Sequence, residues 1–112
     1  VALTNTAPVA ANSVYADLTS PLATTNLSGA TPFNVTTTSC EQTSGTLTLV
    51  LVDLTLTATG AVGPFRYVVL YNDTPSSPAD PLIGWWDYAS EVTMANTETF
   101  LIDFAATTIS LS

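Results

Sequence analysis

The chain has 112 residues, one arginine, no lysine and no histidine, and a formal net charge of −8 at pH 7. This balance argues against nucleic acid and anionic membranes as partners, because both need several cations to neutralise phosphates. Catalysis that depends on His, Lys or a Cys–His pair is excluded because those side chains are missing. We therefore expect no nucleic-acid partner, no membrane partner and no enzyme of those classes.

Charged residues make up only 9% of the chain, against about 25% in an ordinary soluble domain, while 46% of the residues are hydrophobic. Such a surface is solvated less securely than one rich in Lys and Glu, and we infer that other chains cover part of it. The length suits a single domain. Cys40 is the only cysteine, and we interpret it as a buried or inert thiol.

Residues 1–45 are built mainly from Ala, Thr, Ser, Asn and Pro, and only "SVYADL", Ser13 to Leu18, suggests a short ordered element. Their low charge distinguishes them from an ordinary disordered tail. We expect an extended N-terminal arm or edge segment that becomes ordered by lying on a surface. Loops and edge strands of the same domain are an alternative that the sequence leaves open.

Residues 46–112 alternate with a period of two and are rich in Thr, which predicts an antiparallel β domain. In "TLTLVLVDLTLTA" the leucines change phase at Val52 and Asp53, which predicts a β-bulge or a sharp bend there. The expected fold is all-β, a small antiparallel β-sandwich or barrel that carries the extended N-terminal arm.

A central hairpin is predicted from "PFRYVVLYN", a loop with three prolines, and "LIGWWDYA". If Tyr71 faces Leu82, paired positions sum to 153, which places the lone arginine, Arg66, opposite Asp87 as a structural ion pair. The same register predicts the pairs Phe65 with Tyr88, Tyr67 with Trp86, and Val69 with Gly84.

Both faces of this hairpin are apolar, so each needs a cover. One cover is expected to be a second sheet, and the other the N-terminal arm, a symmetry mate or a different protein. A last hairpin is predicted from "EVTM", a turn at Ala95 and Asn96, and "TETFLIDF", whose Phe100, Ile102 and Phe104 share a face. "TISLS" is expected to close the chain as a short edge strand.

Two kinds of site could be built from oxygen atoms. Paired carboxylates of a glycoside hydrolase could be Asp87 with Glu91 or Asp53, but nine acidic residues produce some close pair by chance. The loop from Asn72 to Asp80 could hold Ca²⁺, although its spacing matches no EF-hand and Asn and Asp are good turn residues. We expect no enzyme, no metal and no cofactor.

The segments "NTAPVAANSVYADLT", "GPFRYVVLYNDT" and "PLIGWWDY", followed by "FLIDF" and "ISLS", resemble small tailed-bacteriophage virion proteins encoded among head genes. The resemblance implies a structural virion protein, a capsid decoration (cement) protein on the exterior of the phage head. It implies the major capsid protein as partner and a homo-oligomer, with a trimer favoured.

The alternative is a tail or fibre-associated virion module that binds a host glycan through Trp85, Trp86 and the loop from Asn72 to Asp80. For the decoration role, candidate partner-binding residues lie in the N-terminal segment and on the central hairpin. They are Val1, Leu3, Pro8, Val14, Tyr15, Leu18 and Trp85.

Overall fold

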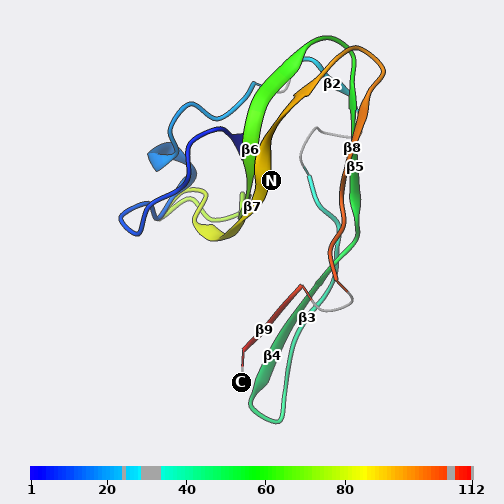
Figure 1. The fold of residues 1–112 in the computed structure, drawn as a ribbon. Coiled ribbons are helices and arrows are strands. Elements are labelled where there is room, and N and C mark those ends of the chain that lie inside the picture. The colour runs from blue at the N-terminus through cyan, green and yellow to red at the C-terminus, as the bar shows by residue number, and fades with distance from the viewer. Residues whose placement is uncertain (24, 29–33, 106–107, 112) are drawn as a thin grey trace.

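The computed structural model describes residues 1–23, 25–28, 34–105 and 108–111 (Figure 1). They form an antiparallel all-β fold, as predicted, with one short 3₁₀ turn, η1 (Tyr15–Asp17), and no helix that could span a bilayer. Three sheets of three strands have the orders β1-β6-β7, β2-β5-β8 and β3-β4-β9. The strands are β1 (Ala2–Thr4), β2 (Leu27–Ser28), β3 (Thr37–Thr43), β4 (Thr46–Leu51), β5 (Leu54–Ala58), β6 (Val62–Tyr71), β7 (Leu82–Met94), β8 (Thr99–Ile102) and β9 (Ile109–Leu111).

The main hydrophobic core lies between the β1-β6-β7 and β2-β5-β8 sheets, which gives the fold its sandwich-like character. Phe65 of β6 is fully buried, and its ring meets Phe100 of β8 edge to face with centroids 5.2 Å apart. The expected inward face of the last apolar segment is confirmed, since Ile102 and Phe104 are buried in this core and Phe100 packs against it. Other core members are Val1, Leu3, Leu27, Leu51, Leu56, Ala58, Val62, Val68, Leu70 and Met94.

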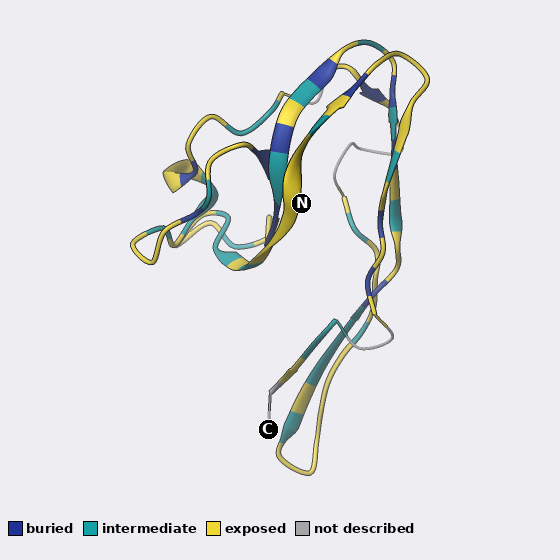
Figure 2. Ribbon diagram, in the orientation of Figure 1, coloured by how far each residue is buried: buried dark blue, intermediate teal, exposed yellow. Residues whose placement is uncertain are grey.

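Strand β6 is covered on both faces, which matches the two-sided apolar pattern of its sequence. Val68 and Leu70 belong to the main core, whereas Val69 packs in a second cluster with Ala2 and Leu18. Burial alternates less on β6 than a one-sided strand requires (Figure 2). The chain's own N-terminal residues therefore supply the second cover of β6.

Residues 1–23 lie along this sheet. Strand β1 pairs with β6 through Ala2, Leu3 and Thr4, and Leu3 is fully buried. The Thr4 hydroxyl donates a 2.7 Å hydrogen bond to the carbonyl of Thr19. The short element expected at Ser13 to Leu18 is confirmed as η1. Whether residues 1–45 act as a separable arm stays a prediction, but β1 is hydrogen-bonded into the sheet.

The β3-β4-β9 sheet projects from the body and lengthens the molecule (Figure 1). The dimensions are 46 × 29 × 27 Å, with a radius of gyration of 14.5 Å, against about 13 Å for a compact domain of this length. The chain leaves this sheet for β5 at Val52 and Asp53, which lie between β4 and β5. The predicted break at these residues is confirmed, as is the terminal edge strand, β9.

The predicted register of the central hairpin is wrong beyond its first pair. Tyr71 does face Leu82, but Leu70 then pairs with Gly84, Val69 with Trp85 and Tyr67 with Asp87. Ile83 is an extra residue that moves each later pair by one position, so side chains expected on one face of β7 lie on the other. Trp86 consequently lies opposite Val68 rather than Tyr67, and neither Arg66 with Asp87 nor Phe65 with Tyr88 forms a direct pair.

The predicted last hairpin is also wrong. Strand β8 pairs with β5 in the other sheet and not with β7. The reason lies at the turn after β7, where the Thr97 N–H donates to the Ala58 carbonyl and the Ala58 N–H donates to the Glu98 carbonyl, both at 2.8 Å. These two bonds fasten the turn to the end of β5, so the chain crosses between sheets and leaves β7 at an edge.

Replacing Leu3 with Ala tests how far β1 belongs to the folded domain. Leu3 is fully buried, so Leu3→Ala should lower the free energy of unfolding by roughly 2–5 kcal/mol. The matched control is Val9→Ala at a side chain that is 62% exposed, which should change it by less than about 0.5 kcal/mol. Urea denaturation followed by circular dichroism measures both; equal stabilities would contradict the placement of β1.

Candidate binding cleft between two edge strands

Strand β7 bulges away from β6 over residues 88–91. Asp87 pairs with Tyr67 and Val92 pairs with Phe65, so these four residues of β7 face the single residue Arg66. A bulge interrupts the hydrogen-bonded ladder and re-aims the side chains it carries. Here it directs Tyr88 toward β8, where its ring meets Phe100 with centroids 5.2 Å apart.

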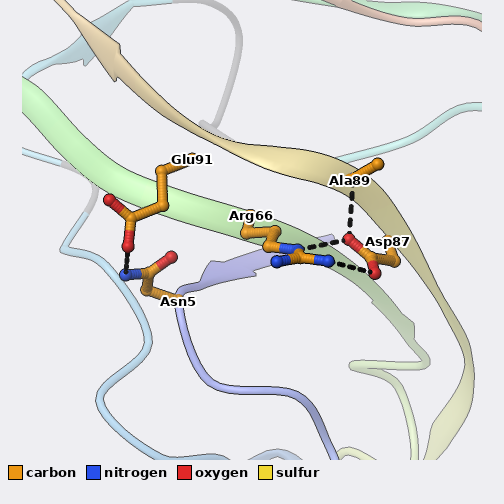
Figure 3. Close-up of polar contacts among 5 residues, drawn as sticks. All are labelled: Asn5, Arg66, Asp87, Ala89 and Glu91. Atoms are coloured by element: carbon orange, nitrogen blue, oxygen red, sulfur yellow. Dashed lines mark hydrogen bonds and ion pairs between the residues drawn. The ribbon is translucent and has the colours of Figure 1, made fainter.

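Arg66 and Asp87 form a two-point ion pair at the start of this bulge (Figure 3). The guanidinium donates from Nε to Oδ1 at 2.7 Å and from Nη2 to Oδ2 at 2.9 Å. The predicted ion pair is present although the predicted register is wrong, because the long arginine side chain reaches Asp87 diagonally. Both side chains are more than a third exposed, so the pair by itself contributes little to global stability.

The ion pair matters locally because Asp87 also accepts a 2.7 Å hydrogen bond from the N–H of Ala89. Ala89 has φ +72°, a left-handed conformation that costs an alanine about 1–2 kcal/mol, and this hydrogen bond helps to hold it. At the far end of the bulge, Glu91 accepts a 2.8 Å hydrogen bond from the side-chain amide of Asn5 (Figure 3). The bulge is thus fixed at both ends.

Hydrogen bonding shifts the pKa of both members of the pair. The guanidinium of Arg66, and then the N–H of Ala89, lower the pKa of Asp87 below its ordinary value. The bond to Asp87 raises the pKa of Arg66. Asp87 is therefore ionised at neutral pH, and its contribution to the bulge should be lost only in acid.

A cleft of about 440 Å³ lies between β7 and β8. Both strands are edges of their sheets, in the orders β1-β6-β7 and β2-β5-β8. Large apolar side chains remain exposed around the cleft: Trp86 is 40% exposed, Tyr88 56% and Leu101 54%. The lining residues are Val68, Trp86, Asp87, Tyr88, Phe100, Leu101, Ile102, Asp103, Phe104, Ala105 and Thr108.

Aromatic contacts across the cleft join its two sides. Trp86 and Phe104 have centroids 6.0 Å apart in an edge-on arrangement, and Tyr88 meets Phe100 in the same manner. The backbone of Phe104 is fixed in place, because its N–H donates a 2.7 Å hydrogen bond to the carboxylate of Asp53. The cleft is therefore preformed: Trp86 and Tyr88 lie on β7, Phe100 lies on β8 of the other sheet, and Phe104 follows the end of β8.

A second groove, also of about 440 Å³, lies on the other side of β7 between that strand and the N-terminal segment. Its lining includes two of the predicted partner-binding residues, Pro8 and Trp85. Trp85 is 45% exposed and its ring contacts Tyr67 at 5.6 Å. Trp85 and Trp86 point to opposite faces of β7, because neighbouring residues on a strand alternate.

The remaining candidate residues are divided between the interior and the surface. Val1, Leu3, Pro8 and Leu18 are buried within the chain, and Val14 and Tyr15 are partly buried. Tyr15 contacts Tyr71 at 5.0 Å. Buried side chains offer no surface to a partner in this conformation, which leaves Trp85 as the exposed member of the set. Sequence reasoning missed the cleft residues Tyr88, Leu101 and Phe104, because they meet only when β7 and β8 belong to different sheets.

The side chains weighed for other chemistry have structural partners. Asp87, Glu91 and Asp53 accept the hydrogen bonds described above, and Asn72 accepts one from the N–H of Thr74 at 3.1 Å in a local turn. Within the described ranges, no three His, Cys, Asp or Glu residues gather where they could hold a metal. Cys40 is exposed on β3, so of the expected buried or inert thiol the burial is wrong, because the projecting sheet leaves its side chain uncovered; its inertness stays a prediction.

Comparisons with models of protein families, with curated proteins and with solved structures found no match. The functional argument therefore depends on the cleft and its chemistry.

Asp87→Asn should lower the stability of the protein at neutral pH, because it removes the charge that pairs with Arg66. Because the pKa of Asp87 is lowered, its contribution is fully present above the ordinary value of 3.8 and is lost progressively as the pH falls from there through the lowered pKa. The difference between wild type and variant should therefore shrink in acid. Glu98→Gln, at an exposed carboxylate in the turn, is the control for a charge change alone. Urea denaturation at pH 7 and pH 3 measures this; a difference at pH 3 as large as that at pH 7 would contradict it.

Proposed function

We propose that this protein is a non-enzymatic virion protein that decorates the outside of a bacteriophage head and stabilises it by binding across neighbouring capsid subunits. The cleft between β7 and β8 is the observation that supports a binding role most strongly. Trp86, Tyr88 and Leu101 stay exposed there in a chain with few charges. Contiguous exposed apolar surface of this kind is typical of an interaction site, and the sequence resemblance suggests the capsid as its target.

The shape of the molecule supports a bridging role. A protein that joins neighbouring subunits needs at least two contact surfaces, and the cleft and the projecting β3-β4-β9 sheet are separate features of an elongated chain. On that sheet Leu47 is 39% exposed. A protein that binds only the assembled shell stabilises it by mass action.

The charge of the chain is compatible with a place on the exterior of the head. A net charge of −8 would oppose contact with packaged DNA, but an exterior protein makes no such contact. We propose the major capsid protein as partner and a homo-oligomer, preferably a trimer, as the binding unit. No cofactor takes part in this function.

The alternative, a tail or fibre module that binds a host glycan, is supported by Trp85, which lines the second groove and is 45% exposed. An exposed indole offers a flat apolar face on which a sugar ring can stack. Because Trp86 points to the opposite face of β7, the two tryptophans do not form one platform. A glycan site would therefore use Trp85 alone.

Co-sedimentation with expanded, undecorated heads tests the proposal. Wild-type protein should sediment with the heads, and Leu101→Ser in the cleft should weaken binding by roughly tenfold or more, as expected for a central contact. Val52→Ser is the control, because Val52 is similarly exposed, at 47%, but does not line the cleft. Failure of the wild type to sediment, together with binding to a glycan array that Trp85→Ala abolishes, would favour the alternative.

A further inference from the structure

We propose that the cleft accepts an extended segment of the partner protein that carries alternating apolar and cationic side chains and pairs with the free edge of β7. This inference rests on the proposed function, since it names the surface and the chemistry through which the partner is bound. It is carried by the free edge, the apolar lining and the charge of the cleft.

The free edge comes from the topology. Strand β7 has 13 residues and a strand neighbour only on its β6 side, and β8 has a neighbour only on its β5 side. Proteins commonly protect an exposed edge with lysine or proline, but β7 contains neither. At the start of β7 the Leu82 N–H already donates to the Ser13 carbonyl at 2.9 Å. Beyond Leu82, the backbone groups of β7 that point away from β6 are available to an added strand, a recurring mode of peptide recognition.

The lining of the cleft favours apolar side chains on the added strand. Its volume of about 440 Å³ lies within the range of roughly 300–1,000 Å³ found for ligand pockets. Trp86 and Phe104 approach each other across it, while Tyr88 and Leu101 stand at its border with about half of their surface exposed. Every second side chain of an extended segment could rest against these rings.

The charge of the cleft favours extended segments that carry cationic side chains. The lining contains two carboxylates, Asp87 and Asp103, and no cationic side chain. The chain's only basic side chain, Arg66, is already bound to Asp87. Asp103 is exposed between the buried residues Ile102 and Phe104, where a lysine or arginine of the partner could meet it.

The same argument disfavours a second copy of this chain as the occupant. Two copies would each bring a net charge of −8, and neither has an uncommitted cation to offer Asp103. Like charges brought together at an interface oppose association. A homo-oligomer would therefore use other surfaces, such as the projecting sheet.

The bulge limits how far an added strand can pair. The regular ladder between β6 and β7 stops at Tyr67 and Asp87 and resumes only at Phe65 and Val92. Because a bulge breaks the hydrogen-bonding pattern of its strand, an added strand should pair with β7 before Tyr88 and end there. Tyr88 then closes one end of the binding site.

Synthetic peptides test this directly. In Trp85→Phe, Trp86 is the only remaining tryptophan, so its fluorescence reports on the cleft. The probe is an eight-residue peptide that alternates valine with lysine and threonine. It should produce a saturable change in fluorescence, whereas the same peptide with glutamate for lysine should bind at least tenfold more weakly. A third peptide, N-methylated at alternate backbone positions, cannot form the ladder and should lose binding to a similar extent.

Cleft variants complete the experiment. Asp103→Asn should reduce the preference for lysine over glutamate, Leu101→Ser should weaken both peptides, and Val52→Ser should change neither. Absence of saturable binding would overturn the inference. Equal affinity for the lysine and glutamate peptides would overturn its charge requirement, and full binding of the N-methylated peptide would overturn strand pairing. Self-association that Leu101→Ser abolishes would show that a second copy occupies the cleft instead.

The outcome is separable from that of the proposed function. Peptide binding by a protein that does not sediment with heads would support the cleft and contradict the capsid role. Head binding that is unaffected by Leu101→Ser and Asp103→Asn, without peptide binding, would support the capsid role and overturn this inference.

Discussion

The hydrogen bonds that Asp87 accepts from Arg66 and from the N–H of Ala89 determine where β7 leaves β6. From Leu70 and Gly84 to Tyr67 and Asp87 the two strands form a regular ladder, and after it four residues of β7 face one of β6. Tyr88 is carried toward Phe100 by this divergence. An exposed ion pair that contributes little to global stability thus has a large effect on local geometry.

The second constraint is the crossing of the chain after β7. Neighbouring strands in a sequence usually pair with each other. Had β8 paired with β7, backbone hydrogen bonds would join the two strands and no cleft would lie between them. Instead the turn is bound to Ala58 at the end of β5, and β8 extends the other sheet. Two edges are left facing an apolar opening, and the low charge of the chain leaves that opening without lysines to block another strand.

The class of fold could be predicted from the sequence, because Thr content and a period of two are local signals. The phase change at Val52 and Asp53 marked the passage between two sheets for the same reason. Register and strand partners could not be predicted. One extra residue at Ile83 moved the pairing of Trp86 from Tyr67 to Val68, and no local pattern records which residue will bulge. The ion pair was predicted correctly although the register was wrong by one residue. The long side chain of Arg66 still reaches Asp87 across that shift.

The site was predicted less well than the fold. Apolar residues near the N-terminus suggested contacts with a partner, yet Leu3 is buried in the main core and Leu18 in the second cluster that covers the chain's own sheet. The apolar pattern alone does not distinguish a side chain that packs inside the chain from one that stays exposed and binds a partner. The distinction depends on long-range topology, which joins Trp86 and Tyr88 of β7 to Leu101 and Phe104 across the cleft.

Site-specific photo-crosslinking on assembled heads tests the central claim, that the opening between β7 and β8 is occupied by another protein. A photoreactive phenylalanine analogue is placed at Tyr88 in one variant and at Val52 in another, and each is bound to purified, undecorated heads before irradiation. The account predicts a covalent adduct with the capsid protein from position 88 and none from position 52. An adduct from position 52 without one from position 88 would contradict it.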